Sequence, residues 1–253
     1  MISRSDVRIA TRGDIGEKAT RHAREEVVKV TRRLHDPILF ARVTLTLTDD
    51  PANERPAIAQ AMLDVNGQPV RAVAHAATAL QAVDLMCERL RHQFEHLTDR
   101  RLARRARGPA SADAHEWRHG DAPTARPRHF PRPPEDRRVV RHTTYALEPL
   151  TPAEAADQMA LLDYDFHLYV DADTGREAVV ERVDGGNVRV RLVPDGASAS
   201  DARPPVPTLD VDEAARSLDL VGQDWIFFRD RTTGRGAVVY RRYDGHYGAI
   251  TTA

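Results

Sequence analysis

Apolar and polar residues follow two different periods along the first hundred residues. Alternation in steps of two predicts four short strands, at residues 6–11, 40–48, 57–65 and 70–75. Apolar spacings of three and four predict two amphipathic helices, from Asp14 as a possible N-cap to residue 34, and at residues 77–107. Asn66-Gly67 favours a tight hairpin between the third and fourth strands. Residues 1–107 therefore predict an α+β domain of order β-α-β-β-β-α, with two helices on one face of a four-stranded sheet.

The periodic pattern stops in two stretches of the chain. Residues 108–138 contain six prolines and three histidines but hardly any aliphatic residue, so they cannot bury enough apolar surface to offset the entropy of ordering. They are interpreted as a flexible linker. A second, shorter linker is predicted at residues 194–207. The remaining segments are residues 139–193 and 208–253.

These two C-terminal segments repeat one pattern of helix, strand, D-x-x-T-G turn, AVV strand and D-G turn. Their helices start at Thr151 and Asp210, each followed three residues later by a glutamate, which is the spacing of a capping box. The first copy alone carries a leading strand, VVRHTTYALEP. A unit this short cannot bury its apolar face by itself. We therefore expect the two copies, two small α+β modules, to pack on each other as an intramolecular pseudo-dimer.

The pairing surface is expected to be formed by large apolar and aromatic side chains at equivalent places in the two modules. An alternative use for such rings is the stacking of nucleic-acid bases, but the acidic charge of this half of the chain argues against that use. The predicted module-pairing residues are Phe166, Leu168, Tyr169, Trp225, Phe227, Phe228, Tyr240, Tyr243 and Tyr247.

The formal net charge of −1 hides a strong asymmetry. Residues 1–107 hold 19 Lys and Arg against 14 Asp and Glu, whereas residues 139–253 hold 12 against 19. A basic front half favours contact with a polyanion such as RNA. The alternative is that these are ordinary solvated helix faces in an arginine-rich chain. The candidate RNA-binding residues are Lys18, Arg21, Lys29, Arg32, Arg33, Arg71, Arg89, His92, Arg100, Arg101, Arg104 and Arg105.

The sequence offers little for catalysis. Residues 92–96 match the H-x-x-E-H pattern of some zinc peptidases, but Phe94 belongs to the apolar stripe and the neighbouring arginines would repel a dication. Cys87 lies on the same stripe and is interpreted as a core residue. We find no Ser-His-Asp arrangement, P-loop or dinucleotide glycine motif, and the two D-x-x-T-G segments are interpreted as turns. We expect no enzyme activity, no metal and no cofactor.

The cellular compartment is also indicated by the sequence. A single cysteine excludes an internal disulfide framework and fits a reducing compartment. The N-terminal residues lack an apolar signal core, and no apolar run approaches the roughly 18 residues of a membrane span. We therefore expect a cytoplasmic protein that contacts no membrane.

The C-terminal motifs resemble those of a known family. LTPAEAADQMALLDYDFHLYVDADTG and GQDWIFFRDRTTGRGAVVYRRYDGHYGAI are similar to the C-terminal module of the long-form ribosome hibernation-promoting factors, which are related to the ribosome-associated inhibitor A proteins. The element order and basic helices of residues 1–107 are similar to the N-terminal domain of that family. The resemblance covers nearly all of the chain except the two linkers.

The resemblance implies a function and a partner. In that family the N-terminal domain occupies the mRNA channel and tRNA sites of the small ribosomal subunit, which inhibits translation and protects idle ribosomes. The C-terminal module normally pairs with that of a second copy and so joins two ribosomes. Because this chain carries the module twice, we expect pairing within one chain, a monomer, and single silenced ribosomes. The alternatives are a factor that still dimerises ribosomes and a stand-alone structured-RNA-binding or RNA-chaperone protein. No contact with DNA is expected.

Overall fold

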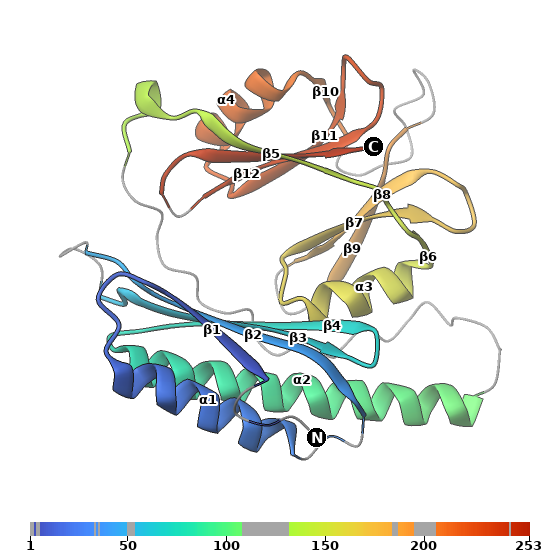
Figure 1. Cartoon of the computed structure of the whole chain (residues 1–253). Helices are drawn as coiled ribbons and strands as arrows, with labels where there is room; N and C mark the ends of the chain where they lie inside the picture. The colour runs from blue at the N-terminus through green and yellow to red at the C-terminus, as the bar shows by residue number, and fades with distance from the viewer. Residues whose placement is uncertain are drawn as a thin grey trace. The chain divides into compact units, whose positions relative to one another are not determined.

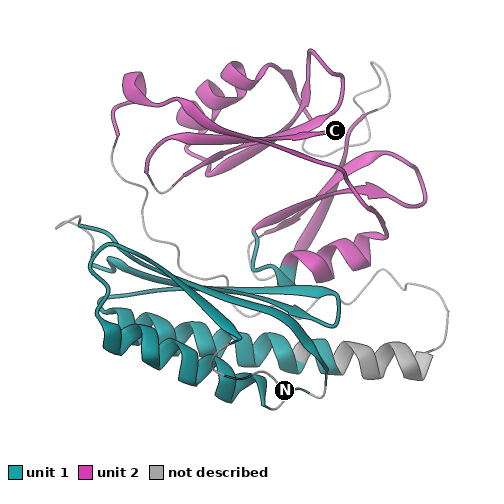
Figure 2. Ribbon diagram, viewed as in Figure 1, with its two compact units in different colours: residues 1–116, 122–127, 160–164 teal, residues 117–121, 128–159, 165–253 magenta. Residues whose placement is uncertain are grey.

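The computed structural model divides the chain into two compact units, coloured separately in Figure 2. The described residues of the first unit lie within residues 3–107 and 160–164, and those of the second within 132–159 and 165–253. The structure describes residues 3, 6–32, 34, 36–49, 54–107, 132–183, 187–194, 206–242 and 244–253, and the side chains of residues 96 and 99–107 lie outside this description. No helix among these residues has both the length and the apolar character needed to cross a membrane.

The first unit is built on one four-stranded sheet. Its strands are β1 (Val7–Arg12), β2 (Ile38–Leu47), β3 (Ala57–Val65) and β4 (Gln68–Ala76), which pair in the order β1-β2-β3-β4. β1 is parallel to β2, and the other pairs are antiparallel. The helices α1 (Glu17–Thr31) and α2 (Ala79–Arg107) lie along one face of this sheet (Figure 1). The predicted β-α-β-β-β-α fold is confirmed.

The core of this unit follows from the two periods of the sequence. In β3 every second residue is buried, and three of these residues are alanines that let the helices pack closely on the sheet. Asn66 and Gly67 both have positive φ, 54° and 84°, as a two-residue hairpin turn requires. The predicted hairpin is therefore confirmed.

The start of α1 differs from the prediction. The helix begins at Glu17 and its N-cap is Gly16, not Asp14. The chain first turns at Gly13, where φ is 80° and an added Cβ would lie 2.4 Å from the carbonyl oxygen of Leu47. Residues 13–16 therefore form a turn packed against β2, and the helix begins only after it. The apolar spacing of the sequence gives no sign of this turn.

The second unit contains two sheets with one helix each. The first module has the order β6-β7-β8-β9, formed by β6 (Pro149–Leu150), β7 (Phe166–Asp171), β8 (Glu177–Arg182) and β9 (Val188–Leu192). The second has the order β10-β11-β12-β13-β5, formed by β10 (Thr208–Leu209), β11 (Trp225–Asp230), β12 (Gly236–Arg241), β13 (Tyr247–Thr252) and β5 (Val139–Tyr145). Helices α3 (Pro152–Leu161) and α4 (Val211–Val221) pack on the sheets of the first and second modules.

The local motifs of the two modules match the prediction. Thr151 and Glu154 exchange hydrogen bonds at the start of α3, and Asp210 and Glu213 form the capping box of α4. In both D-x-x-T-G turns the aspartate side chain accepts a backbone hydrogen bond, and the glycine has positive φ. These turns set the hairpins β7-β8 and β11-β12 in the same register.

The leading strand β5 pairs differently from the prediction. The sequence pattern groups it with the first module, but it is hydrogen-bonded in parallel to β13, as the edge strand of the second module's sheet (Figure 1). Just before it, a short 3-10 helix, η1 (Pro134–Asp136), lies in what the sequence predicts to be flexible linker. The rest of that predicted linker, residues 108–131, lies outside the described residues.

Candidate functional site

Four basic side chains form a stripe on α1. Lys18, Arg21, Lys29 and Arg32 are all exposed. At 100° per residue they fall within about a quarter of the helix circumference, opposite the buried Ala23 and Val27. Lys29 is 3.3 Å from Glu26, so part of its charge is already balanced. Cations in a row at this spacing can follow a phosphate backbone. Arg33, the fifth residue predicted on this helix, lies outside the described residues.

Arg71 and Arg89 are half-buried and already hydrogen-bonded within the first unit. Arg71 Nη1 donates to the carbonyl oxygens of Leu162 and Asp163 at 3.2 and 3.3 Å. Arg89 Nη1 donates to the carbonyl oxygen of Val73 at 3.0 Å and lies 3.7 Å from the Asp163 carboxylate. Because of these hydrogen bonds, fewer N–H donors of either guanidinium are free to contact RNA unless the side chain rearranges. Their RNA contact stays a prediction.

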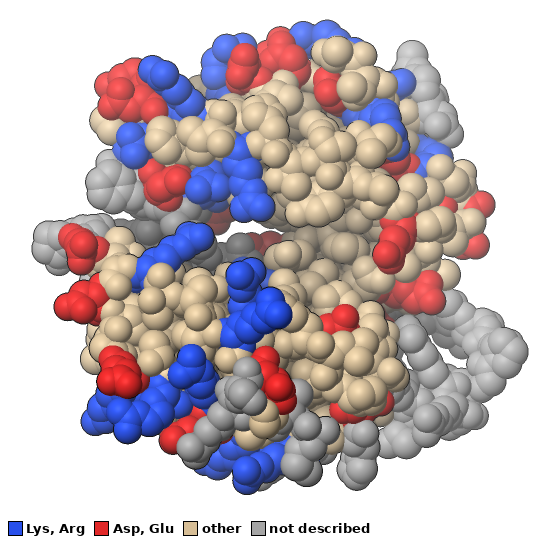
Figure 3. Space-filling model, in the orientation of Figure 1, with Lys and Arg blue, Asp and Glu red and all other residues tan. Residues whose placement is uncertain are grey.

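The remaining candidates lie on α2. His92 is exposed, and its Nδ1 atom is 3.8 Å from Glu95. Four of the predicted arginines lie near the C-terminal end of the helix, but their side chains are outside the described part of the chain: Arg100, Arg101, Arg104 and Arg105. On the visible face, Lys and Arg form several separate groups with acidic residues between them (Figure 3). This visible face is therefore not uniformly basic.

Cys87 is buried in the core of the first unit, as the sequence predicts. Burial first, and then the nearby carboxylates of Glu26 and Asp84, raise the pKa of its thiol to about 12. A nucleophilic cysteine needs the opposite shift. The thiol therefore serves packing and not chemistry.

The two modules of the second unit share an apolar cluster, which we call the inter-module cluster. It is formed by Val179, Val193, Val206, Phe227 and Val238, with Phe166, Leu168, Trp225, Tyr240 and Ile250 packed against them. The rings of Phe166 and Trp225 have their centroids 4.6 Å apart. Five of the predicted pairing residues thus lie in one cluster: Phe166, Leu168, Trp225, Phe227 and Tyr240.

Three other predicted pairing residues belong to the cores of their own modules. Tyr169 packs with α3, while Phe228 and Tyr247 pack with α4. The reason is the alternation of a strand, since neighbours such as Leu168 and Tyr169 face opposite sides of the sheet. The prediction grouped the aromatic residues without regard to this alternation, and so it combined residues of the two sheet faces. Tyr243 lies outside the described residues.

Polar and charged side chains lie beside the inter-module cluster. Arg191 of β9 lies 5.4 Å from the ring centroid of Trp225 and is 2.9 Å from Glu181 of β8. Burial lowers the pKa of Arg191, and Glu181 acts in the opposite direction. The Glu177 carboxylate of β8 accepts two hydrogen bonds from the second module. One comes from Arg235 Nε at 2.7 Å and the other from the backbone N–H of Gly236. The sequence analysis missed these polar residues, although aligning the two copies does show where they differ.

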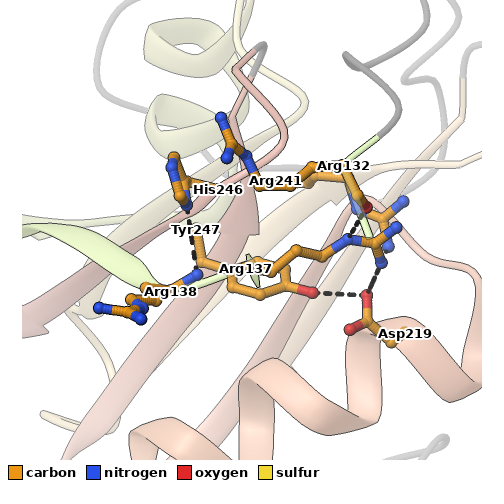
Figure 4. Close-up of polar contacts among 7 residues, drawn as sticks. All are labelled: Arg132, Arg137, Arg138, Asp219, Arg241, His246 and Tyr247. Carbon is orange, nitrogen blue, oxygen red and sulfur yellow. Dashed lines mark hydrogen bonds and ion pairs between the residues drawn. The ribbon is translucent and has the colours of Figure 1, made fainter. Parts of the chain in front are cut away.

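A third polar group attaches the end of the linker to the second module (Figure 4). Asp219 of α4 accepts hydrogen bonds through one oxygen from Arg137, Arg241 and the Tyr247 hydroxyl. Arg137 also donates to the carbonyl oxygen of Arg132, at 2.8 Å. This group holds the segment that leads into β5 against the module.

Comparison with known proteins agrees with the duplication. The family model described as "Sigma 54 modulation/S30EA ribosomal protein C terminus" matches the chain twice, over residues 134–190 and 201–249. The two matches fall on the two C-terminal segments that repeat one pattern in the sequence. The first match begins before β5, so β5 belongs to the first copy in sequence although it completes the sheet of the second.

The chain is similar to whole proteins as well. It is 34% identical over 226 residues to the "Dormancy associated translation inhibitor" of Mycobacterium tuberculosis, covering 83% of this chain and 76% of that protein. It is 30% identical over 168 residues to the "Ribosome hibernation promotion factor" of Deinococcus radiodurans, covering 64% of this chain and 85% of that protein. The crystal structure of the Thermus thermophilus Protein Y N-terminal domain matches at 19% identity with a TM-score of 0.31, over 36% of this chain and 98% of that one. The full-length relatives place the chain in the long-form ribosome hibernation promotion factor family.

Proposed function

We propose that this protein inhibits translation by binding the small ribosomal subunit through its N-terminal domain, in the mRNA channel and tRNA sites. It acts without enzymatic chemistry, in the cytoplasm where ribosomes are. It keeps idle ribosomes single, because its two C-terminal modules pair within one chain. Family membership and the names of the relatives support the hibernation role.

The binding half of the proposal is supported by the basic stripe on α1. Lys18, Arg21, Lys29 and Arg32 are all exposed on one side of the helix, although Lys29 is also paired with Glu26. Binding of this kind depends steeply on salt, because each phosphate contact releases counterions. A-form RNA is contacted mostly through phosphates and 2′-hydroxyls, so no base-specific motif is required.

The observation that carries the single-ribosome claim is the inter-module cluster. Phe227 and Val179, from different modules, are fully buried there within one chain. Buried apolar surface contributes about 25 cal/mol per Å², and the covalent connection raises the effective concentration of each module for the other. The apolar surface that could join a second chain is thereby occupied.

Sedimentation of ribosomes with added protein tests the proposal. We expect the protein to move with small subunits and single ribosomes, to inhibit translation in a cell-free system, and to produce no ribosome-dimer peak. A dimer peak that grows with added protein would overturn pairing within one chain and favour a dimerising factor.

A second measurement separates ribosome binding from general RNA binding. Binding to small subunits and to naked duplex RNA is compared in rising salt. We expect small subunits to retain the protein at salt concentrations that release it from duplex. Equal retention would favour the alternative, a stand-alone structured-RNA-binding protein.

A further inference from the structure

Glu177 and Gly236 occupy the same position in the two modules. Both directly follow a D-x-x-T-G-R turn, and both are the first residue of the corresponding strand, β8 or β12. The neighbouring residues agree, since Arg176 corresponds to Arg235. The copies therefore differ at this position by a whole charged side chain.

The two residues also contact each other across the inter-module cluster. The Glu177 carboxylate accepts the backbone N–H of Gly236 and lies 2.7 Å from the Arg235 guanidinium. An added Cβ on Gly236 would lie 3.2 Å from Glu177 Oε2, 3.2 Å from a Phe227 ring carbon and 3.1 Å from a Val193 methyl carbon. The absence of a side chain at Gly236 is what makes room for the glutamate.

Pairing of like modules would lose this fit. Because the position faces its own counterpart, two first modules would bring two Glu177 side chains into one space, with like charges in a largely buried site. Two second modules would bring Gly236 against Gly236, which leaves a gap. The Arg235 side chain of each module would then have no Glu177 carboxylate to pair with. Only the unlike pair fills the space and satisfies the charge.

A second difference between the copies lies at the same interface. The strand registers place Arg191 opposite Val179 and Ile250 opposite Val238, so Arg191 and Ile250 correspond. Likewise Glu181, which binds Arg191, corresponds to Tyr240. The buried ion pair belongs to the first module, and the ring on which its arginine rests, Trp225, belongs to the second.

We propose that Glu177 and Gly236 are specificity determinants that make the first module accept the second and reject another copy of itself. This inference rests on the proposed pairing within one chain, and it names the partner that the surface fits. Selectivity of this kind can come from a favourable unlike pair, from an unfavourable like pair, or from both. Glu177 supplies both.

Exchanging the two residues in the full-length protein tests the proposal. Gly236→Glu alone crowds the site and is expected to lower the melting temperature of the C-terminal unit by about 5 °C. Glu177→Gly alone should lower it less. The double variant carries the glutamate at residue 236 and the glycine at residue 177. Arg176 is then the arginine that corresponds to Arg235 in the wild-type contact. We expect the double variant to recover at least half of the loss caused by Gly236→Glu.

Thr232→Glu, at an exposed position in the turn before β12, controls for the added charge and should leave the melting temperature unchanged. If the losses of the two single variants simply add in the double variant, the proposed complementarity is wrong. The mass of the wild-type protein in sedimentation velocity is a separate readout: a dimer would overturn pairing within one chain, while the exchange would still decide whether unlike modules are preferred.

Discussion

Asp219 shows how much of the second unit depends on one carboxylate. Its oxygen accepts hydrogen bonds from the linker end, from β12 and from β13, and its side chain is 23% exposed. Hydrogen bonds to a charged group in such a site stabilise by about 1.5–3 kcal/mol each when the partners are matched. Removing the charge leaves two arginines close together with no carboxylate between them.

Asp219→Asn is therefore expected to lower the free energy of unfolding of the C-terminal unit by about 2 kcal/mol. Tyr247→Phe, which removes one donor only, should cost about 1.5 kcal/mol. Denaturant unfolding measures both. Asp173→Asn makes the same charge change at an exposed turn and should stay within about 0.5 kcal/mol of wild type. Equal effects of the two Asp→Asn changes would contradict the role given to Asp219.

Cys87 gives a second prediction at the scale of one residue. Burial raises the pKa of its thiol to about 12, so the thiol stays protonated throughout the neutral range. We expect no reaction with a thiol reagent at neutral pH in the folded protein and one equivalent of reaction after denaturation. Absorbance of the released thiolate follows both. Rapid reaction of the folded protein would show that the core opens at this helix.

At the scale of an element, α1 carries the clearest RNA-binding prediction. The test variant reverses two neighbouring charges of the stripe, Lys18→Glu and Arg21→Glu. The control variant makes the same net change in charge on exposed residues of the C-terminal unit, Arg138→Glu and Arg216→Glu. The first pair should weaken binding to small subunits. It should also reduce the slope of log binding constant against log salt concentration by roughly one per lost phosphate contact. The second pair should leave both nearly unchanged. Equal weakening would mean that binding follows overall charge and not this helix.

The capping box of α4 predicts a pH dependence. The Asp210 backbone N–H first, and then the Arg231 side chain, hold the pKa of Glu213 below its ordinary value of 4.5. A carboxylate with a lowered pKa stabilises the folded state fully above the unfolded value and loses that contribution as pH falls through the folded one.

Glu213→Gln should therefore flatten the fall of the melting temperature below about pH 4.5 relative to wild type. Above that pH the variant should melt slightly lower, because the glutamine is a weaker partner for Arg231. Melting curves between pH 3 and pH 7 measure the difference. Parallel curves for the two proteins would show that other carboxylates control the acid sensitivity.

The elements were predictable where a single period or turn residue decides the structure. The alternation in β3, the Asn66-Gly67 turn and the capping boxes are local, so the sequence pattern suffices. The pairing of β5 with β13 is not local, and no residue of β5 indicates which sheet it joins. The pattern also showed the apolar residues of the inter-module cluster, but the aromatic residues were grouped without regard to the strand alternation that places Phe227 and Phe228 on opposite faces. The difference between Glu177 and Gly236 is visible when the two copies are aligned, but their contact becomes visible only in the structure.

At the scale of the whole molecule, pairing within one chain predicts what happens when the connection is cut. A protease site inserted in the short linker at residues 194–207 would sever the two modules after folding. We expect the fragments to elute together in size exclusion, because the inter-module cluster and the β5–β13 pairing hold them. Separate elution under native conditions would contradict a stable interface between the modules.

The pairing of β5 with β13 also sets an order of events during synthesis. Arg141 and Gly248 are partners in the sheet but stand 107 positions apart in the chain. At roughly 5–20 residues per second, β5 waits about 5 to 20 seconds before its partner is made. Until then it is an unpaired strand, which is prone to pair with other chains. An inhibitor of translation thus depends on uninterrupted translation to complete its own C-terminal fold, so ribosome stalling between the two modules should yield a product that needs chaperones.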